Sequence, residues 1–246
     1  GGKTWNHPET LGGFFGGTIR GVTDKLTYIQ ESGFNTLWLS PIFPSPSHHG
    51  YDATDFYSIE PRLGTINDFK ELVNSAHERQ MRIILDFVPN HISYQHPIFQ
   101  EALRNSNSPY TQWFTFNQWP EKYETFFGVK SLPQLNLHHP GARQYVIDAA
   151  KFWLEQGVDG FRLDYAIGPV QEFWAEFRKG TRAINPDCWT FGEVVDPPDM
   201  QRDFGGLLDG CLDFMLLEAI RQTIAFQTWS LPRFVSFLDR HEAYFS

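Results

Sequence analysis

The chain has 246 residues, of which 41% are hydrophobic and 20% charged, a composition that supports a folded core and argues against intrinsic disorder. Its 29 acidic and 20 basic residues give a formal net charge of −9, which argues against nucleic acid as a partner because phosphates need a broad basic face. No run of eighteen apolar residues occurs and residues 1–5 do not resemble a signal peptide, so we expect no membrane partner and leave the cellular location open.

Five short apolar runs predict strands. In chain order they are residues 35–39, 82–88, 160–164, 189–193 and, as the weakest, 210–214. Runs of this length and composition are typical of strands that are buried on both faces.

Amphipathic helices separate these strands. An apolar spacing of i, i+4, i+7 predicts one helix over residues 22–33, and a capping-box pattern from Thr65 to Asp68 predicts the start of another. A further helix is predicted from Ala142 to Gly157. Helices that alternate with short buried strands indicate βα units and a parallel sheet.

Residues 91–139 interrupt this alternation, because they are rich in Asn, Pro, Trp and Phe and have no clear period. We interpret them as a small subdomain inserted between the second strand and its helix. The chain then divides into residues 1–90, 91–139 and 140–246.

Polar residues lie at the ends of the predicted strands. Asp86 and His91 belong to the second strand, Arg162 and Asp164 to the third, and Glu193 to the fourth. The carboxyl ends of parallel strands form one active face, and carboxylates that lie close together shift each other's pKa, as acid–base and nucleophilic catalysis requires. Taken singly, each carboxylate could be a helix cap or a structural ion-pair partner, but their conjunction favours a site.

Five segments carry a family resemblance. They are residues 50–55, 86–91, 132–136, 160–164 and 192–195. In order and composition they resemble the motifs of the alpha-amylase family, glycoside hydrolase family 13, over a stretch from about Gly12 to Phe214. The resemblance implies an α/β fold, a segment of a (β/α)8 TIM barrel (about strands 2 to 6), with the subdomain inserted after the third barrel strand.

The resemblance also implies a retaining glycoside hydrolase that cleaves α-1,4-glucosidic bonds of starch or maltooligosaccharides and requires no cofactor. Asp164 would be the nucleophile that forms a glycosyl-enzyme intermediate, and Glu193 the acid and base. Arg162 would hold Asp164 ionised and oriented. Transglycosylation, in which a sugar replaces water, would use the same residues.

Three further residues would bind substrate. His91 would hydrogen-bond the sugar at the cleaved bond, Tyr51 would stack beneath it, and Asp86 would be a supporting residue at the rim formed by the strand ends. The aromatic residues of the insertion either offer flat faces to sugar rings or form the subdomain's own core. We favour the core for most of them, because an insertion of this size needs one to stay ordered.

Calcium is the metal that the resemblance brings into consideration, because the family position of Asn90 can be a calcium ligand. Residues 165–168, however, read Tyr-Ala-Ile-Gly where calcium-bearing alpha-amylases have a Lys-His pair. This departure argues against calcium. It places the resemblance nearest the neopullulanase and cyclomaltodextrinase branch, or an intermediate group.

The family needs a third carboxylate at the end of the seventh barrel strand. Glu242 is the candidate, but the apolar spacing of residues 234–245 predicts a helix there. We therefore expect a barrel segment that stops before the seventh strand and needs missing barrel segments or self-association to cover its open edges. The alternatives to an active enzyme are an inactive fragment and a non-catalytic glucan-binding or scaffold relative of the same barrel.

Overall fold

The computed structural model describes residues 16–195 and 198–245, and the structural statements below concern those residues. Gly12, where the family resemblance begins, lies outside them. The elements in chain order are α1 (Ile19–Thr23), α2 (Leu26–Glu31), β1 (Thr36–Leu39), α3 (Ile66–Glu78), β2 (Arg82–Phe87), α4 (Pro97–Arg104), η1 (Thr111–Trp113), β3 (Phe116–Gln118), β4 (Lys122–Tyr123), η2 (Phe126–Gly128), α5 (Pro140–Glu155), β5 (Gly160–Leu163), α6 (Gln171–Ile184), β6 (Trp189–Gly192), α7 (Pro198–Arg202), β7 (Gly210–Cys211), α8 (Phe214–Ile220), η3 (Arg221–Ala225) and α9 (Leu231–Phe245). Within this part of the chain, no helix has both the length and the hydropathy needed to cross a membrane.

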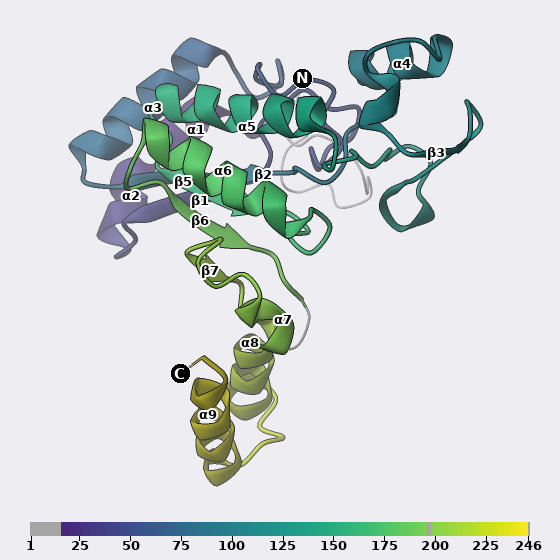
Figure 1. The fold of residues 1–246 in the computed structure, drawn as a ribbon. Coiled ribbons are helices and arrows are strands. Elements are labelled where there is room, and N and C mark those ends of the chain that lie inside the picture. The colour runs from purple at the N-terminus through teal and green to yellow at the C-terminus, as the bar shows by residue number, and fades with distance from the viewer. Residues whose placement is uncertain (1–15, 196–197, 246) are drawn as a thin grey trace.

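Five parallel strands form the main sheet in the order β1-β2-β5-β6-β7, and each corresponds to a predicted strand. The parallel α/β prediction is therefore confirmed. The prediction that β1 is buried is wrong, because β1 is an edge strand of the described sheet and alternates exposed with half-buried residues. Figure 1 shows α3, α5 and α6 covering one face of the sheet, while α8 and α9 extend away from its end.

On the other face of the sheet, the strand register aligns the side chains of neighbouring strands in rows. The first row consists of Trp38, Ile84, Gly160 and Trp189. The second row, two residues further along the strands, consists of Asp86, Arg162 and Phe191. Side chains alternate between faces along a strand, so Asp164 and Glu193, two residues beyond the second row, continue on this face. The face is curved, because Trp38 of β1 contacts Phe191 of β6 across two intervening strands, with ring centroids 5.7 Å apart.

Side-chain caps mark the starts of several helices. The predicted capping box is present, since the Thr65 hydroxyl accepts from the backbone N–H of Asp68 and the Asp68 carboxylate accepts from that of Thr65. The single helix predicted over residues 22–33 is wrong. Two short helices lie there instead, because Thr18 caps α1 earlier in the chain and α1 ends at Thr23. The helix predicted near the C-terminus is confirmed as α9.

The segment 91–139 contains α4, which was not predicted, and the antiparallel pair β3–β4. Pro97 in the first turn and the His96 ring, which accepts from the backbone N–H of Ile98, start α4. Among the aromatic residues of this segment, Phe114 belongs to the buried core, as favoured, whereas Phe127 is 75% exposed. The aromatic residues of this segment therefore serve both its core and its surface.

Gly160 sets the spacing between β5 and β6, the strands that lead to Asp164 and Glu193. A Cβ atom on Gly160 would lie 1.9 Å from the backbone carbonyl oxygen of Trp189. We expect Gly160→Ala to lower the free energy of unfolding by about 3 kcal/mol, because the two strands must separate. The control is Gly210→Ala in β7, where a Cβ would meet no atom within 4 Å. Urea denaturation measures both variants, and equal stabilities would contradict this packing argument.

Candidate active site

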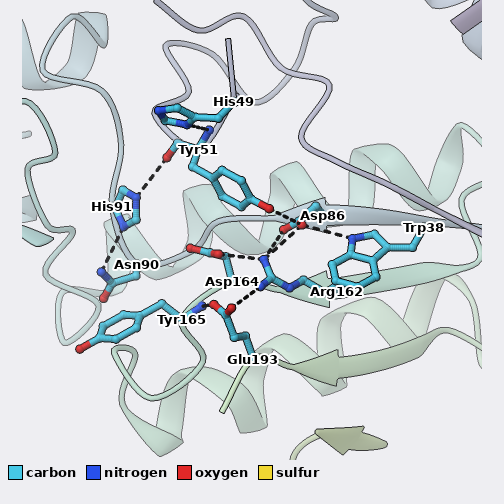
Figure 2. Close-up of polar contacts among 10 residues, drawn as sticks. All are labelled: Trp38, His49, Tyr51, Asp86, Asn90, His91, Arg162, Asp164, Tyr165 and Glu193. Carbon is cyan, nitrogen blue, oxygen red and sulfur yellow. Dashed lines mark hydrogen bonds and ion pairs between the residues drawn. The ribbon is translucent and has the colours of Figure 1, made fainter. Parts of the chain in front are cut away.

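The guanidinium of Arg162 lies at the centre of a cluster of three carboxyl groups, of which Asp86 and Asp164 are buried and Glu193 is half-buried (Figure 2). Its Nη1 atom is 2.8 Å from Asp86 Oδ1 and 2.8 Å from Asp164 Oδ1, and its Nη2 atom is 2.7 Å from Glu193 Oε1. Arg162 and Asp86 lie in neighbouring strands at paired positions, and Asp164 and Glu193 directly follow β5 and β6. The structure thus brings together the four charged residues that the sequence predicted for one face.

Asp86 is held by two donors besides Arg162. The Tyr51 hydroxyl donates to Asp86 Oδ2 at 3.0 Å, and the indole Nε1–H of Trp38 donates to the same oxygen at 3.2 Å. Both rings also lie over the guanidinium, with the Arg162 Cζ atom 5.2 Å from the Trp38 ring centroid and 5.9 Å from that of Tyr51. Asp86 therefore lies at the end of β2 as a buried residue that three side chains hold in place.

The backbone after β5 positions Glu193. The N–H of Tyr165 donates to Glu193 Oε2 at 3.3 Å, and the N–H of Ala166 donates to the Glu193 carbonyl oxygen at 3.1 Å. Tyr165 has a φ of 45°, a left-handed conformation that is rare for a residue with a side chain. Strained conformations of this kind concentrate at functional sites. This backbone role of Tyr165 was not predicted, since a sequence does not reveal φ.

Burial and like charges shift the titration of the cluster. Burial raises the pKa of Asp164 to about 7, and the charges of Asp86 and Glu193 act in the same direction while Arg162 opposes them. Burial also raises the pKa of Asp86, against the opposing effects of Arg162, Tyr51 and Trp38. Like charges therefore act on the pKa of Asp164, as the sequence predicted for one member of the cluster, but burial is the larger cause.

His91 lies beside this cluster but is only 1% exposed. Its Nε2–H donates to the carbonyl oxygen of Tyr51 at 3.1 Å, and its Nδ1 accepts from the amide of Asn90 at 3.3 Å. Phe126 stacks on the ring at a centroid distance of 4.4 Å, and burial lowers the pKa of His91 to about 4, so the ring is neutral. In this arrangement His91 supports the Tyr51 loop, and its contact with a sugar stays a prediction.

The surroundings of Asn90 do not fit a calcium site. Calcium takes six or more oxygen ligands, commonly including carboxylates. The Asn90 amide instead faces a ring nitrogen of His91 and packs closely on Gly168, where a Cβ would lie 2.1 Å from Asn90 Oδ1. Over residues 16–195 and 198–245, no three His, Cys, Asp or Glu side chains converge to hold a metal ion. No step below is routed through a metal.

Glu242, the candidate third carboxylate, lies on α9. This helix packs against α7 and α8, and Figure 1 shows it well away from the strands that carry Arg162. The neighbouring His241 contacts Asp213 at 2.8 Å, and Glu242 itself is exposed. The helical interpretation of this segment is confirmed, and Glu242 does not join the Arg162 cluster.

The fold and site have clear relatives. The model of the alpha-amylase catalytic domain matches residues 2–216. Alpha-amylase 2 of Dictyoglomus thermophilum is 44% identical over 244 residues, covering 99% of this chain and 43% of that protein. Neopullulanase 2 of Thermoactinomyces vulgaris is 37% identical over 235 residues, covering 92% and 40%. The cyclic α-maltosyl-(1→6)-maltose hydrolase of Arthrobacter globiformis, solved in complex with maltose, superposes with a TM-score of 0.91 at 32% identity, covering 96% of this chain and 55% of that one.

These matches also show how much of its relatives the chain covers and which branch of the family it resembles. The chain spans about two fifths of the length of these two curated relatives. Its other relatives include a cyclomaltodextrinase and an intracellular maltogenic amylase, in agreement with the predicted branch. The five-stranded sheet is a segment of the family's (β/α)8 barrel, as the sequence predicted. The chain therefore belongs to the alpha-amylase family, glycoside hydrolase family 13.

Proposed function

We propose that the whole protein hydrolyses α-1,4-glucosidic bonds of starch or maltooligosaccharides with retention of the anomeric configuration. The observation that carries the proposal is the Arg162 guanidinium, which contacts Asp164 through Nη1 and Glu193 through Nη2. One cation thereby holds two carboxyl groups together at the same edge of the sheet. Retaining hydrolysis needs such a pair, one as nucleophile and one as acid and base.

In the first step Asp164 is the nucleophile. Glu193 enters the step protonated and gives its proton to the glycosidic oxygen as the bond from that oxygen to the anomeric carbon breaks. A carboxylate oxygen of Asp164 bonds to the anomeric carbon, and the leaving sugar departs with a new hydroxyl group. Burial assists this step, because the buried Asp164 carboxylate is poorly solvated whereas the ester it forms is neutral.

In the second step water replaces the leaving sugar. Glu193, now a carboxylate, takes a proton from a water molecule whose oxygen attacks the anomeric carbon, and the bond to Asp164 breaks. Two displacements at the same carbon restore its original configuration. The N–H of Tyr165 holds Glu193 Oε2 in place through both steps.

The substrate class follows from the rings next to the cluster. Phe127 is largely exposed and lies 5.3 Å from Tyr165 between ring centroids, so the two rings form an apolar surface beside the backbone that contacts Glu193. Glucosyl rings have apolar faces that pack on such surfaces. The similar Arthrobacter hydrolase was solved with maltose, which is in keeping with an α-glucan as substrate.

The test is reducing-sugar release from soluble starch and maltohexaose over a range of about pH 5 to 8, because the first step needs Asp164 ionised and Glu193 protonated at the same time. We expect Glu193→Gln to lower the rate about 10²–10⁴-fold, because an amide cannot donate or accept the proton. Glu242→Gln is the matched control, since it makes the same chemical change on the exposed face of α9.

Loss of activity in Glu193→Gln alone would support the proposed roles. Equal rates in the wild type and Glu193→Gln would contradict them, and loss in Glu242→Gln would return Glu242 to the site. Saccharide binding without sugar release by the wild type would favour a non-catalytic glucan-binding relative.

A further inference from the structure

Trp38 contacts two members of the Arg162 cluster at once. Its indole N–H donates to Asp86 Oδ2, and its ring lies over the Arg162 guanidinium. It reaches them because β1 pairs with β2 and the sheet curves, so that the Trp38 side chain lies on the same face as the second row (Figure 2). Trp38 is held in turn by Phe191, with ring planes at 89°.

The Arg162 guanidinium needs such a support. Its Nε atom is buried and, among the described residues, has no hydrogen-bond partner, so the group is fixed by its two terminal nitrogens. Nη1 is shared between Asp86 and Asp164, and Nη2 contacts Glu193. A guanidinium that is hydrogen-bonded only through its terminal nitrogens can tilt by rotation about the Cδ–Nε bond of the side chain. An aromatic ring over its face limits that motion.

We propose that Trp38 is a positioning residue for the Asp86–Arg162 pair. Its N–H fixes the carboxylate of Asp86 and its ring fixes the plane of Arg162. Arg162 then presents its remaining N–H groups to Asp164 and Glu193 in one orientation. That this positioning affects catalysis rests on the proposed function. The contacts of Trp38 with Asp86 and Arg162 do not depend on it.

The chain offers a matched control in Trp189. Trp189 lies in the same register row as Trp38 and packs on the same Phe191 ring, at a centroid distance of 4.8 Å. The two indoles are similarly exposed, 46% for Trp38 and 49% for Trp189. Trp38→Phe keeps an aromatic ring and removes the N–H, and Trp189→Phe makes the same change without a contact to Asp86 or Arg162.

The first measurement does not depend on turnover. In ¹H–¹⁵N spectra, the indole signal that is missing from Trp38→Phe should lie at a different chemical shift in Asp86→Asn than in the wild type, because the indole N–H then faces an uncharged acceptor. In ¹³C carboxyl titrations, Asp164 should titrate about 0.5–1 pH unit higher in Trp38→Phe than in the wild type or Trp189→Phe, because a looser guanidinium stabilises the carboxylate less. A Trp38 signal that ignores Asp86→Asn, or an Asp164 titration unchanged in Trp38→Phe, would overturn the inference.

The second measurement separates positioning from folding. With maltohexaose, we expect Trp38→Phe to lower kcat about tenfold while KM stays within about twofold, and Trp189→Phe to match the wild type. The acidic limb of kcat/KM should move to higher pH in Trp38→Phe alone. A wild type without activity would count against the proposed function and leave the inference to the titrations. An active protein in which both phenylalanine variants behave alike would overturn the inference.

Discussion

Asp164→Asn should abolish starch hydrolysis, with kcat lowered by at least about 10⁴-fold. The amide has nearly the same shape as the carboxyl group, but it is a far weaker nucleophile and carries no charge to stabilise the developing cation at the anomeric carbon. Steady-state assays over about pH 5 to 8 measure the loss. Asp239→Asn, on the exposed surface of α9, is the matched control and should retain full activity.

A covalent intermediate gives this prediction a second readout. In Glu193→Gln, a maltosyl donor with a good leaving group needs no acid for the first step, while the second step lacks its base. The peptide that contains Asp164 should therefore gain the mass of a maltosyl group, and the double variant with Asp164→Asn should not. Labelling of another residue, or turnover by Asp164→Asn near the wild-type rate, would contradict the assignment of the nucleophile.

Arg162→Met should lower the free energy of unfolding by about 3–5 kcal/mol at pH 8, because buried carboxyl groups lose the cation that compensates them. Arg182→Met is the control. Arg182 pairs with Asp209 at the surface, and Asp209 keeps its contact with Arg178, so a change within about 1 kcal/mol is expected.

The deficit of Arg162→Met should shrink as the pH falls. Without Arg162, the carboxyl groups of Asp86 and Asp164 have folded pKa values that are raised further above their unfolded values near 4. A raised carboxyl pKa contributes stability below the unfolded value and loses it as the pH rises through the folded value. Urea denaturation between pH 8 and pH 4 measures this trend. A deficit that stays constant or grows toward pH 4 would show that the loss is one of packing rather than of charge.

The sequence predicted the strands and the charged cluster because both depend on local patterns. Short apolar runs mark β2, β5 and β6, and the carboxyl ends of parallel strands bring Arg162, Asp164 and Glu193 together whatever the details of the loops. The Thr65 capping box and α9 were likewise visible, since their signals lie within a few residues of one another.

Features that depend on register or backbone conformation were not predictable from these patterns. Trp38 meets Asp86 because of how β1 pairs with β2 and how the sheet curves, and neither is encoded in the local sequence around Trp38. The left-handed backbone of Tyr165 follows from its place between β5 and the Glu193 carboxyl group. The enclosure of His91 depends on Phe126, a residue of the insertion 35 positions further along the chain.

One guanidinium is shared among three carboxyl groups. The resulting charge balance affects which saccharides can bind at the cleavage position. With Asp86 and Asp164 ionised and Glu193 protonated, as the first step requires, the single positive charge of Arg162 still leaves the cluster with a surplus of negative charge. An uncharged glucosyl unit experiences no net Coulomb force there. A unit that carries a phosphate or a carboxylate is repelled, and weakly screened surroundings strengthen that repulsion. Under the proposed function, this surplus of negative charge should disfavour anionic sugars at the cleavage position, and a phosphorylated maltooligosaccharide should be cut more slowly than its uncharged counterpart.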